Sequence, residues 1–210
     1  MNNVYNFISK SRIIPVVKID DTEKAVKLAK TFVDVGIGII EITFRSDNAL
    51  SCIRKIKEEV SDIIVGAGTV LSVKQAKDAI KAGASFVVSP GVDEKVIKFC
   101  IKKKIFVLPG VVTPTDIQRC LNFGLDTVKF FPSEAAGGIK TIKALVGPFG
   151  GLKFVPTGGI SLKNLKEYLS VPSVIACGGT WLAEPELIKN EDFDTIKKIA
   201  IDTLSLIREI

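Results

Sequence analysis

One lysine of this chain lies within a stretch that otherwise has the composition of a buried strand. Residues 127–131 read TVKFF, and Lys129 is the charged residue among them. Burying an ammonium group without a partner is unfavourable, so a buried lysine tends to shed its proton. A neutral amine is a nucleophile that can attack a ketone and form a Schiff base, which then acts as an electron sink. The sequence therefore makes Lys129 a candidate for covalent catalysis.

A second apolar stretch carries ionisable residues on one face. Residues 39–45 read IIEITFR. Because side chains alternate along a strand, Glu41, Thr43 and Arg45 share a face. Glu41 is suited to proton transfer, and Arg45 to a two-point grip on a substrate carboxylate. Together with Lys129 they fit carbon–carbon bond chemistry beside a ketone that bears an acid group. The alternative is an ion-pair network that closes the core.

Two pairs of glycines form a further candidate site. Residues 157–159 read TGG, and residues 178–180 read GGT. Glycines let backbone N–H groups approach an anion closely, and helix N-termini favour negative charge. These segments predict a phosphorylated substrate. The alternative is that the glycines only form tight turns.

The composition argues against several classes of function. The 210 residues include no histidine, so the commonest metal ligand and catalytic base is absent. The four cysteines are scattered without a CxxC pair, which predicts buried reduced thiols and not a zinc site. We therefore expect no metal and no cofactor, with acid–base chemistry carried out by carboxylates, lysine, tyrosine or water.

Charge and hydropathy also limit the partners. The net charge is +6, but the lysines are spread over helical stretches without an Arg-rich patch, so we expect no nucleic-acid partner. No window approaches the roughly 18 apolar residues of a membrane helix, so we expect no membrane partner. The N-terminal stretch MNNVYNFISKSR lacks a long apolar run, which argues against a signal peptide and for a cytoplasmic location.

Short apolar runs alternate with amphipathic segments along the chain. The runs predict eight buried strands, at Ile13–Val17, Ile39–Phe44, Ile63–Ala67, Phe86–Ser89, Phe106–Pro109, Thr127–Phe131, Phe154–Thr157 and Val174–Cys177. The amphipathic segments predict helices within residues 21–36, 46–60, 72–83, 93–104, 113–124, 137–147 and 161–169. A last helix is expected to begin near Glu184-Pro185 and to run through much of the C-terminus.

This alternation predicts an α/β fold, a (β/α)₈ TIM barrel with a short N-terminal helix, as a single domain over residues 1–210. The alternative, a doubly wound open sheet, would show a glycine-rich nucleotide fingerprint after its first strand. The sequence there is VKIDDTEKA, without a glycine, which favours the barrel. In such barrels the chemistry lies at the C-terminal ends of the strands, and phosphate often binds after the seventh and eighth. Lys129, Glu41, Arg45 and both glycine pairs belong to this end.

Seven segments, taken in order, resemble one known family. They are IIEITFR, VGAGTVL, VSPG, VKFFPSEAAGG, GPFGG, VPTGGIS and CGGTWL. In order and spacing they are similar to the 2-keto-3-deoxy-6-phosphogluconate (KDPG) aldolases, also called 4-hydroxy-2-oxoglutarate (KHG) aldolases. The resemblance runs from about Ile14 to Pro185. It implies a class I, metal-independent aldolase that forms a homotrimer of barrels.

The resemblance also implies a role for each site residue. Lys129 would form the Schiff base, and Glu41 would be the general acid and base. The pyruvate carboxylate would be held by Arg45 and Thr69, in a pocket lined by Pro90 and Phe131. The phosphate would be bound by Thr157, Gly158 and Gly159, with Gly179 and Thr180.

The implied reaction is the reversible cleavage of KDPG to pyruvate and glyceraldehyde 3-phosphate, with KHG as a second substrate. The alternatives are an aldolase for the galactonate-derived epimer, a phosphosugar isomerase or epimerase on the same barrel, and a non-catalytic phosphosugar-binding protein. Two residues depart from the family pattern. Thr180 replaces the usual serine, and Ser133 replaces the commoner alanine, with little effect expected from the second.

Overall fold

The structure is a computed structural model that describes residues 2–210, with side chains from residue 4 onward. Strands and helices alternate along most of the chain. The strands are β1 (Ile13–Val17), β2 (Ile39–Thr43), β3 (Ile64–Gly68), β4 (Phe86–Val88), β5 (Phe106–Leu108), β6 (Gly110–Val111), β7 (Thr127–Phe130), β8 (Lys153–Pro156) and β9 (Cys177–Gly179). The helices are α1 (Asn2–Ser11), α2 (Thr22–Asp34), α3 (Ala49–Glu59), α4 (Val73–Lys81), α5 (Glu94–Lys102), α6 (Pro114–Leu121), the 3₁₀ turn η1 (Glu134–Ala136), α7 (Gly138–Val146), α8 (Leu165–Leu169), α9 (Pro185–Lys189) and α10 (Phe193–Arg208).

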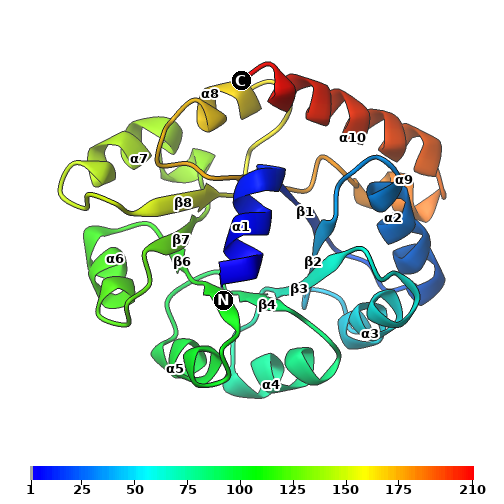
Figure 1. Ribbon diagram of the computed structural model, residues 1–210, viewed down its shortest axis with the longest axis horizontal. Helices are drawn as coiled ribbons and strands as arrows, with labels where there is room; N and C mark the ends of the chain where they lie inside the picture. Colours follow the sequence, from blue (N-terminus) through cyan, green and yellow to red (C-terminus); the bar gives the residue numbers. More distant parts are fainter. Residues whose placement is uncertain (1) are drawn as a thin grey trace.

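The strands form a closed ring of parallel neighbours. One sheet has the order β5-β4-β3-β2-β1-β9, and a second has the order β6-β7-β8. Parallel bridges from Phe154 to Val174 and from Thr157 to Gly178 join β8 to the segment that contains β9. Only Pro109 separates β5 from β6, so these two are pieces of one barrel strand. The ring in Figure 1 therefore confirms the predicted (β/α)₈ barrel.

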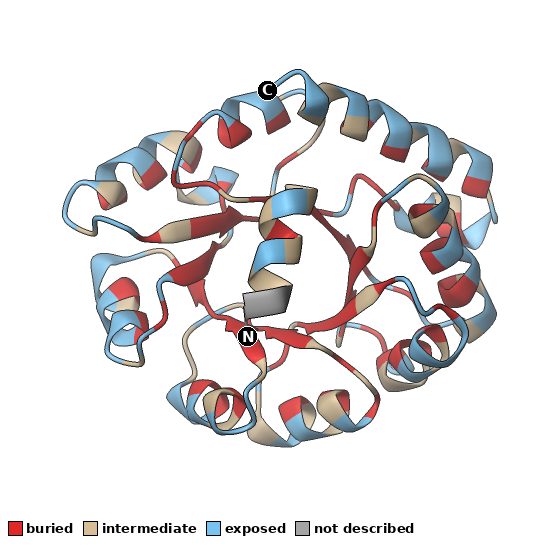
Figure 2. Ribbon diagram, viewed as in Figure 1, coloured by how far each residue is buried: buried red, intermediate tan, exposed pale blue. Residues whose placement is uncertain are grey.

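From α2 onward, the helices lie outside the ring with their apolar faces turned inward. Figure 2 shows buried residues along the strands and the inner helix faces, with exposed residues on the outer faces. Several helices begin at a residue whose side chain caps the first turn. The backbone N–H of Val96 donates to Asp93 at 2.9 Å, and Thr113 and Asp116 form a reciprocal capping box. The caps fix where each helix leaves the loop at the carboxyl end of the preceding strand.

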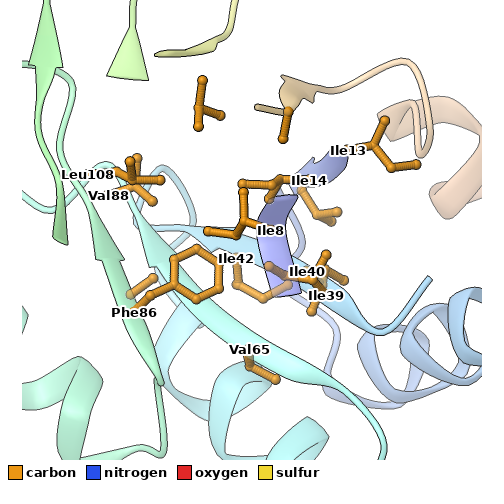
Figure 3. Packing of buried hydrophobic residues seen from close by; sticks show 14 of the residues in the cluster. Ile8, Ile13, Ile14, Ile39, Ile40, Ile42, Val65, Phe86, Val88 and Leu108 are labelled. Atoms are coloured by element: carbon orange, nitrogen blue, oxygen red, sulfur yellow. The ribbon is translucent and has the colours of Figure 1, made fainter. Parts of the chain in front are cut away.

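The N-terminal end of the barrel is closed by α1, which crosses the ring in Figure 1. Ile8 of this helix is fully buried and packs among the interior residues of the strands, as Figure 3 shows. Small and large residues complement one another in this layer. A Cβ at Gly66 would overlap the ring of Phe86, so glycine there leaves room for the phenylalanine in the barrel interior. Side chains therefore fill the N-terminal end of the barrel interior. A cavity can form only at the other end, where the strands have their carboxyl ends.

Several element boundaries differ from the prediction, and three of these differences have a clear physical reason. The eighth strand was expected at Val174–Cys177, but β9 spans Cys177–Gly179, because these residues pair with Ile13–Pro15 of β1. The predicted last helix is two helices, since Glu191 has a φ of 56° and Asp192 caps a new helix by accepting from Thr195 N–H at 3.0 Å.

The third difference is at the start of α3. The predicted helical segment opens at Ser46, yet α3 begins at Ala49. The Ser46 hydroxyl instead donates to the carbonyl of Ile19 at 2.6 Å, which ties the loop after β2 to the loop after β1. Within the part of the chain that the structure describes, no helix is both long and apolar enough to cross a membrane.

Candidate active site

Lys129 and Glu41 face each other across the barrel interior. Lys129 lies on β7 and Glu41 on β2, and their exposed fractions are 7% and 3%. Lys129 pairs in register with Gly110 and Val155, and Glu41 with Val16 and Gly66. The Lys129 Nζ lies 3.9 Å from Glu41 Oε1. This distance lets the charges attract but is too long for a hydrogen bond.

The Glu41 carboxylate carries an unused acceptor. Its Oε1 is buried and has no hydrogen-bond partner among the described residues. A buried polar atom without a partner is unfavourable and rare in native structures, and such atoms often belong to functional sites. A structural ion pair that closes the core would be expected to satisfy both groups. The geometry therefore favours the catalytic interpretation of this pair over the structural alternative.

Gly68 makes room for this carboxylate. Gly68 ends β3 and pairs with Thr43, so it lies beside the β2 residues of the site. A Cβ at position 68 would overlap Glu41 Oε1. The glycine therefore permits the side-chain position that brings Glu41 toward Lys129.

Arg45 lies just beyond β2 and is linked back to β1. Its Nε donates to the Thr43 hydroxyl at 3.4 Å, and that hydroxyl donates to the carbonyl of Val17 at 3.1 Å. Thr43 is buried, whereas Arg45 is exposed at the mouth of the cavity. These hydrogen bonds thus orient the Arg45 side chain at the mouth of the cavity.

Thr69 has a backbone conformation that is rare for its type. Its φ is 57°, in the left-handed region that β-branched residues avoid. Such a conformation costs on the order of 1–3 kcal/mol and tends to persist where function requires it. Thr69 follows Gly68 directly and is half-buried. The strained backbone is consistent with a residue placed to contact a ligand.

A cavity of about 310 Å³ opens at the carboxyl ends of the strands. It brings together all eleven residues that the sequence predicts for the site: Glu41, Arg45, Thr69, Pro90, Lys129, Phe131, Thr157, Gly158, Gly159, Gly179 and Thr180. Three further lining residues, Val16, Thr43 and Ile160, were not predicted as site residues. The alternation that places Thr43 on the face of Glu41 was a usable signal for one of them.

Phe131 partly covers the amine. The Lys129 Nζ lies 4.9 Å from the centroid of the Phe131 ring, within the range of a cation–π contact. The ring and the apolar barrel interior limit the access of water to Lys129. Both features leave the amine facing the cavity, where a substrate ketone could meet it.

The glycine-rich loop adopts a backbone conformation that favours glycine. Gly158 and Gly159 have φ values of 100° and 79°, which side-chain-bearing residues seldom adopt. Gly179 is required for a different reason, which is lack of space: a Cβ there would overlap the ring of Trp181. Thr180 is exposed at the rim of the cavity. The backbone can therefore approach an anion at this side of the cavity.

Neither the cysteines nor the possible metal ligands among the described residues form a second reactive site. All four cysteines are free and buried, which confirms the predicted buried thiols. Burial raises the pKa of Cys52 and Cys100 to about 11 and that of Cys120 to about 12, so these thiols are poor nucleophiles. Among residues 2–210 no group of three or more His, Cys, Asp or Glu side chains is arranged to hold a metal ion.

The chain is similar in sequence and in fold to known proteins. The model of the KDPG and KHG aldolase family matches residues 4–199. A 2-dehydro-3-deoxy-phosphogluconate aldolase of Treponema pallidum is 42% identical over 207 residues, which cover 99% of each chain. The KHG/KDPG aldolase of Escherichia coli strain K12 is 39% identical over 195 residues, covering 93% of this chain and 92% of the relative.

A solved structure agrees with these sequence relatives. The KDPG aldolase of Legionella pneumophila, with pyruvate captured at low pH as a covalent carbinolamine intermediate, has a TM-score of 0.90 at 37% identity. The match covers 93% of this chain and 95% of that one. Fold and site thus define an enzyme of the (β/α)₈ barrel class. The chain belongs to the KDPG and KHG aldolase family.

Proposed function

We propose that this enzyme is a class I aldolase that cleaves KDPG to pyruvate and glyceraldehyde 3-phosphate through a Schiff base on Lys129. One observation carries the proposal: a buried lysine lies 3.9 Å from a buried carboxylate in the cavity. Its relatives support it, since the Legionella protein was captured with pyruvate as a covalent carbinolamine. Family membership and the strand lysine favour this reaction over a phosphosugar isomerase or epimerase, which has no need of a nucleophilic amine.

The covalent part of the reaction begins at the substrate ketone. The neutral amine of Lys129 attacks C2 and forms a carbinolamine. Loss of water, with one proton supplied by Glu41 or by a water beside it, leaves a protonated Schiff base. Glu41 is positioned for this step because its Oε1 is close to Nζ and free of other partners among the described side chains.

Bond cleavage then follows from the electron demand of the iminium. Glu41 takes the proton of the C4 hydroxyl, directly or through a water, and the C3–C4 bond breaks. Its electron pair moves to C3 and the iminium nitrogen to form an enamine, while glyceraldehyde 3-phosphate leaves. Glu41 returns the proton to C3, and hydrolysis releases pyruvate and restores the amine.

The two ends of the cavity suit a substrate that is anionic at both ends. Arg45 and Thr69 would hold the carboxylate beside Lys129, with Pro90 and Phe131 lining that pocket. The backbone of Thr157, Gly158 and Gly159, with Gly179 and Thr180, would bind the phosphate. KHG shares the keto-acid end but has no phosphate, so we propose it as a second, weaker substrate. The printed name of the Escherichia coli relative includes both substrates.

The predicted homotrimer, cytoplasmic location and single domain belong to the same proposal. Four free, buried cysteines are consistent with a reducing compartment. Leu71, 59% exposed after β3, is apolar surface that a subunit contact would cover. Light scattering on the purified chain should give the mass of three copies, and the mass of one copy would contradict the trimer.

The reaction itself is tested by product analysis. Incubation with KDPG should release pyruvate, detected by lactate dehydrogenase, in equal amount to glyceraldehyde 3-phosphate. Conversion of the substrate to an isomer without pyruvate release would contradict the proposal. Binding without turnover would contradict it as well, and would indicate a phosphosugar-binding protein.

A further inference from the structure

Three side chains behind the glycine-rich loop form a buried hydrogen-bonded group, which we call the Tyr168 network. It consists of Ser133, Glu134 and Tyr168. Ser133 is fully buried, and its hydroxyl lies 2.8 Å from that of Tyr168, which is 1% exposed in α8. The Tyr168 hydroxyl also donates to the Glu134 carboxylate. Since a phenol has one proton to give, the Ser133 hydroxyl is the donor toward Tyr168.

The hydroxyl of Tyr168 stays protonated at neutral pH. Burial, and then the hydrogen bond to Glu134, raise its pKa above the usual 10.0. Tyr168 is therefore a permanent donor between two segments that are far apart in the sequence. It joins α8 to the loop that follows β7, the strand of Lys129.

The same loop holds the glycine-rich segment by its carbonyl groups. The N–H of Ser133 donates to the carbonyl of Thr157 at 2.8 Å, and the N–H of Glu134 donates to that of Gly158 at 3.1 Å. The third carbonyl, of Gly159, accepts from the Asn164 amide at 3.0 Å. All three carbonyls of the TGG segment are thus bound on the side of the Tyr168 network.

Binding of these carbonyls also sets the direction of the N–H groups in the same peptide units. In a trans peptide the N–H points away from the carbonyl of its own unit. The N–H groups of Gly158, Gly159 and Ile160 therefore point away from the network, and these three residues line the cavity. Consecutive N–H groups turned to one side form a concave site for an anion.

The glycine pair at 137–138 leaves room for the network. A Cβ at Gly138 would lie 2.9 Å from the Tyr168 hydroxyl and 2.8 Å from Glu134 Oε1. Gly138 also has a φ of 56°. Side chains at this turn would therefore displace the tyrosine or the carboxylate. The segment PSEAAGG is in this respect one structural unit that ends beside α8.

We propose that Tyr168, acting through Ser133 and Glu134, is a positioning residue that fixes the TGG segment for the phosphate of the substrate. This inference rests on the proposed function. The keto-acid end of the cavity is built on β2, β3 and β7, and within the described residues no hydrogen bond of the Tyr168 network reaches Arg45 or Glu41. Loosening the network should therefore weaken binding of the phosphate end and spare the chemistry of pyruvate.

The test compares two reactions of the same enzyme. One is KDPG cleavage, which needs both ends of the cavity. The other is exchange of the pyruvate methyl protons with deuterium, followed by NMR, which needs only the Schiff base and a proton carrier. Tyr168→Phe should raise the KM for KDPG about three- to tenfold, as expected for one or two lost hydrogen bonds, and leave the exchange rate unchanged.

Matched variants guard against a general loss of structure. Tyr5→Phe removes the hydroxyl of the other tyrosine, in α1, and should alter neither reaction. Ser133→Ala should raise the KM for KDPG by less than Tyr168→Phe, because Tyr168 keeps its bond to Glu134. If Tyr168→Phe does not fold, Ser133→Ala still tests the inference.

Two results would overturn the inference. One is an unchanged KM for KDPG in both Tyr168→Phe and Ser133→Ala. The other is an equal loss of cleavage and pyruvate exchange, which would show that the network only stabilises the barrel. A wild-type protein without either reaction would instead refute the proposed function, and the two failures are therefore distinguishable.

Discussion

The Lys129 Nζ and Glu41 Oε1 lie 3.9 Å apart although they come from strands on opposite sides of the barrel. Each side chain is nearly inaccessible, and the carboxylate oxygen has no hydrogen-bond partner among the described residues. A pair held at this distance can exchange protons through a substrate hydroxyl or a single water. A ligand in the cavity could supply the hydrogen-bond donor that the Glu41 carboxylate lacks among the described residues.

Glu41→Gln separates proton transfer from covalent attachment. The amide keeps the shape of the side chain but cannot carry a proton, so we expect kcat for KDPG cleavage to fall about 10²- to 10⁴-fold. Some Schiff base should still form with pyruvate. The matched control is Glu58→Gln, a change at an exposed position of α3 that should leave kcat unchanged. Near-normal turnover in Glu41→Gln would rule out its role as the acid and base.

Gly68→Ala tests the space that Glu41 needs. The added methyl group would overlap Glu41 Oε1 and move the carboxylate away from Lys129. A displacement of about 1 Å at a reacting group can cost about 10²-fold in rate. We expect such a fall in kcat, with folding retained by circular dichroism.

A matched glycine separates this effect from backbone stiffening. A Cβ at Gly150 would meet no atom within 4 Å, so Gly150→Ala should leave kcat unchanged. If Gly68→Ala were as active as Gly150→Ala, the position of Glu41 would not matter to the reaction.

Thr43→Val removes the hydroxyl that links Arg45 to β1. Without it, Arg45 loses the bond at 3.4 Å and the buried carbonyl of Val17 loses its donor at 3.1 Å. We expect the KM for KDPG and for pyruvate to rise about threefold or more. Thr43→Ser keeps the hydroxyl and should restore both values. Equal KM values in the valine and serine variants would show that the hydroxyl does not direct Arg45.

The buried thiols predict a loss of stability at high pH. Burial raises the pKa of Cys52, Cys100 and Cys120 from 9.0 to about 11, 11 and 12, so the folded state holds protons that the unfolded chain releases. This stabilisation is complete below pH 9 and is lost as the pH rises toward 11, by at most about 1.4 kcal/mol per pH unit for each thiol. Urea unfolding between about pH 8 and pH 10.5 measures it.

A cysteine variant provides the comparison. Cys120→Ala should show a shallower decrease of unfolding free energy above pH 9 than the wild type, whatever its stability at neutral pH. The same slope in both proteins would mean that the thiol of Cys120 does not contribute.

The sequence predicts which residues gather at the cavity but not the distances between them. Lys129 and Glu41 were identifiable because each is an ionisable residue within an apolar strand. Their separation of 3.9 Å depends on how the ring closes, and no local pattern encodes that closure. Tyr168 was missed for a similar reason. In the sequence it is one polar-tipped residue of an amphipathic helix, and its partners follow a strand some distance away in the chain.

The predicted element boundaries were wrong where strand register or a turn, and not residue composition, sets the end of the element. Val174 to Cys177 looks like a strand because it is apolar, yet pairing with β1 selects Cys177 to Gly179. The break before α10 depends on the positive φ of Glu191, which a glutamate does not signal. Val16 and Ile160, also missing from the predicted site, are apolar residues whose contact with the cavity becomes visible only in three dimensions.

Borohydride trapping tests the central claim most directly. The wild-type protein is incubated with pyruvate, reduced, digested and analysed by mass spectrometry, beside Lys129→Met treated in the same way. We predict that the wild-type peptide containing Lys129 gains the mass of a carboxyethyl group, and that the variant gains none and loses at least about 10³-fold in kcat. An unmodified Lys129 with pyruvate bound, or an active Lys129→Met, would contradict the Schiff-base mechanism.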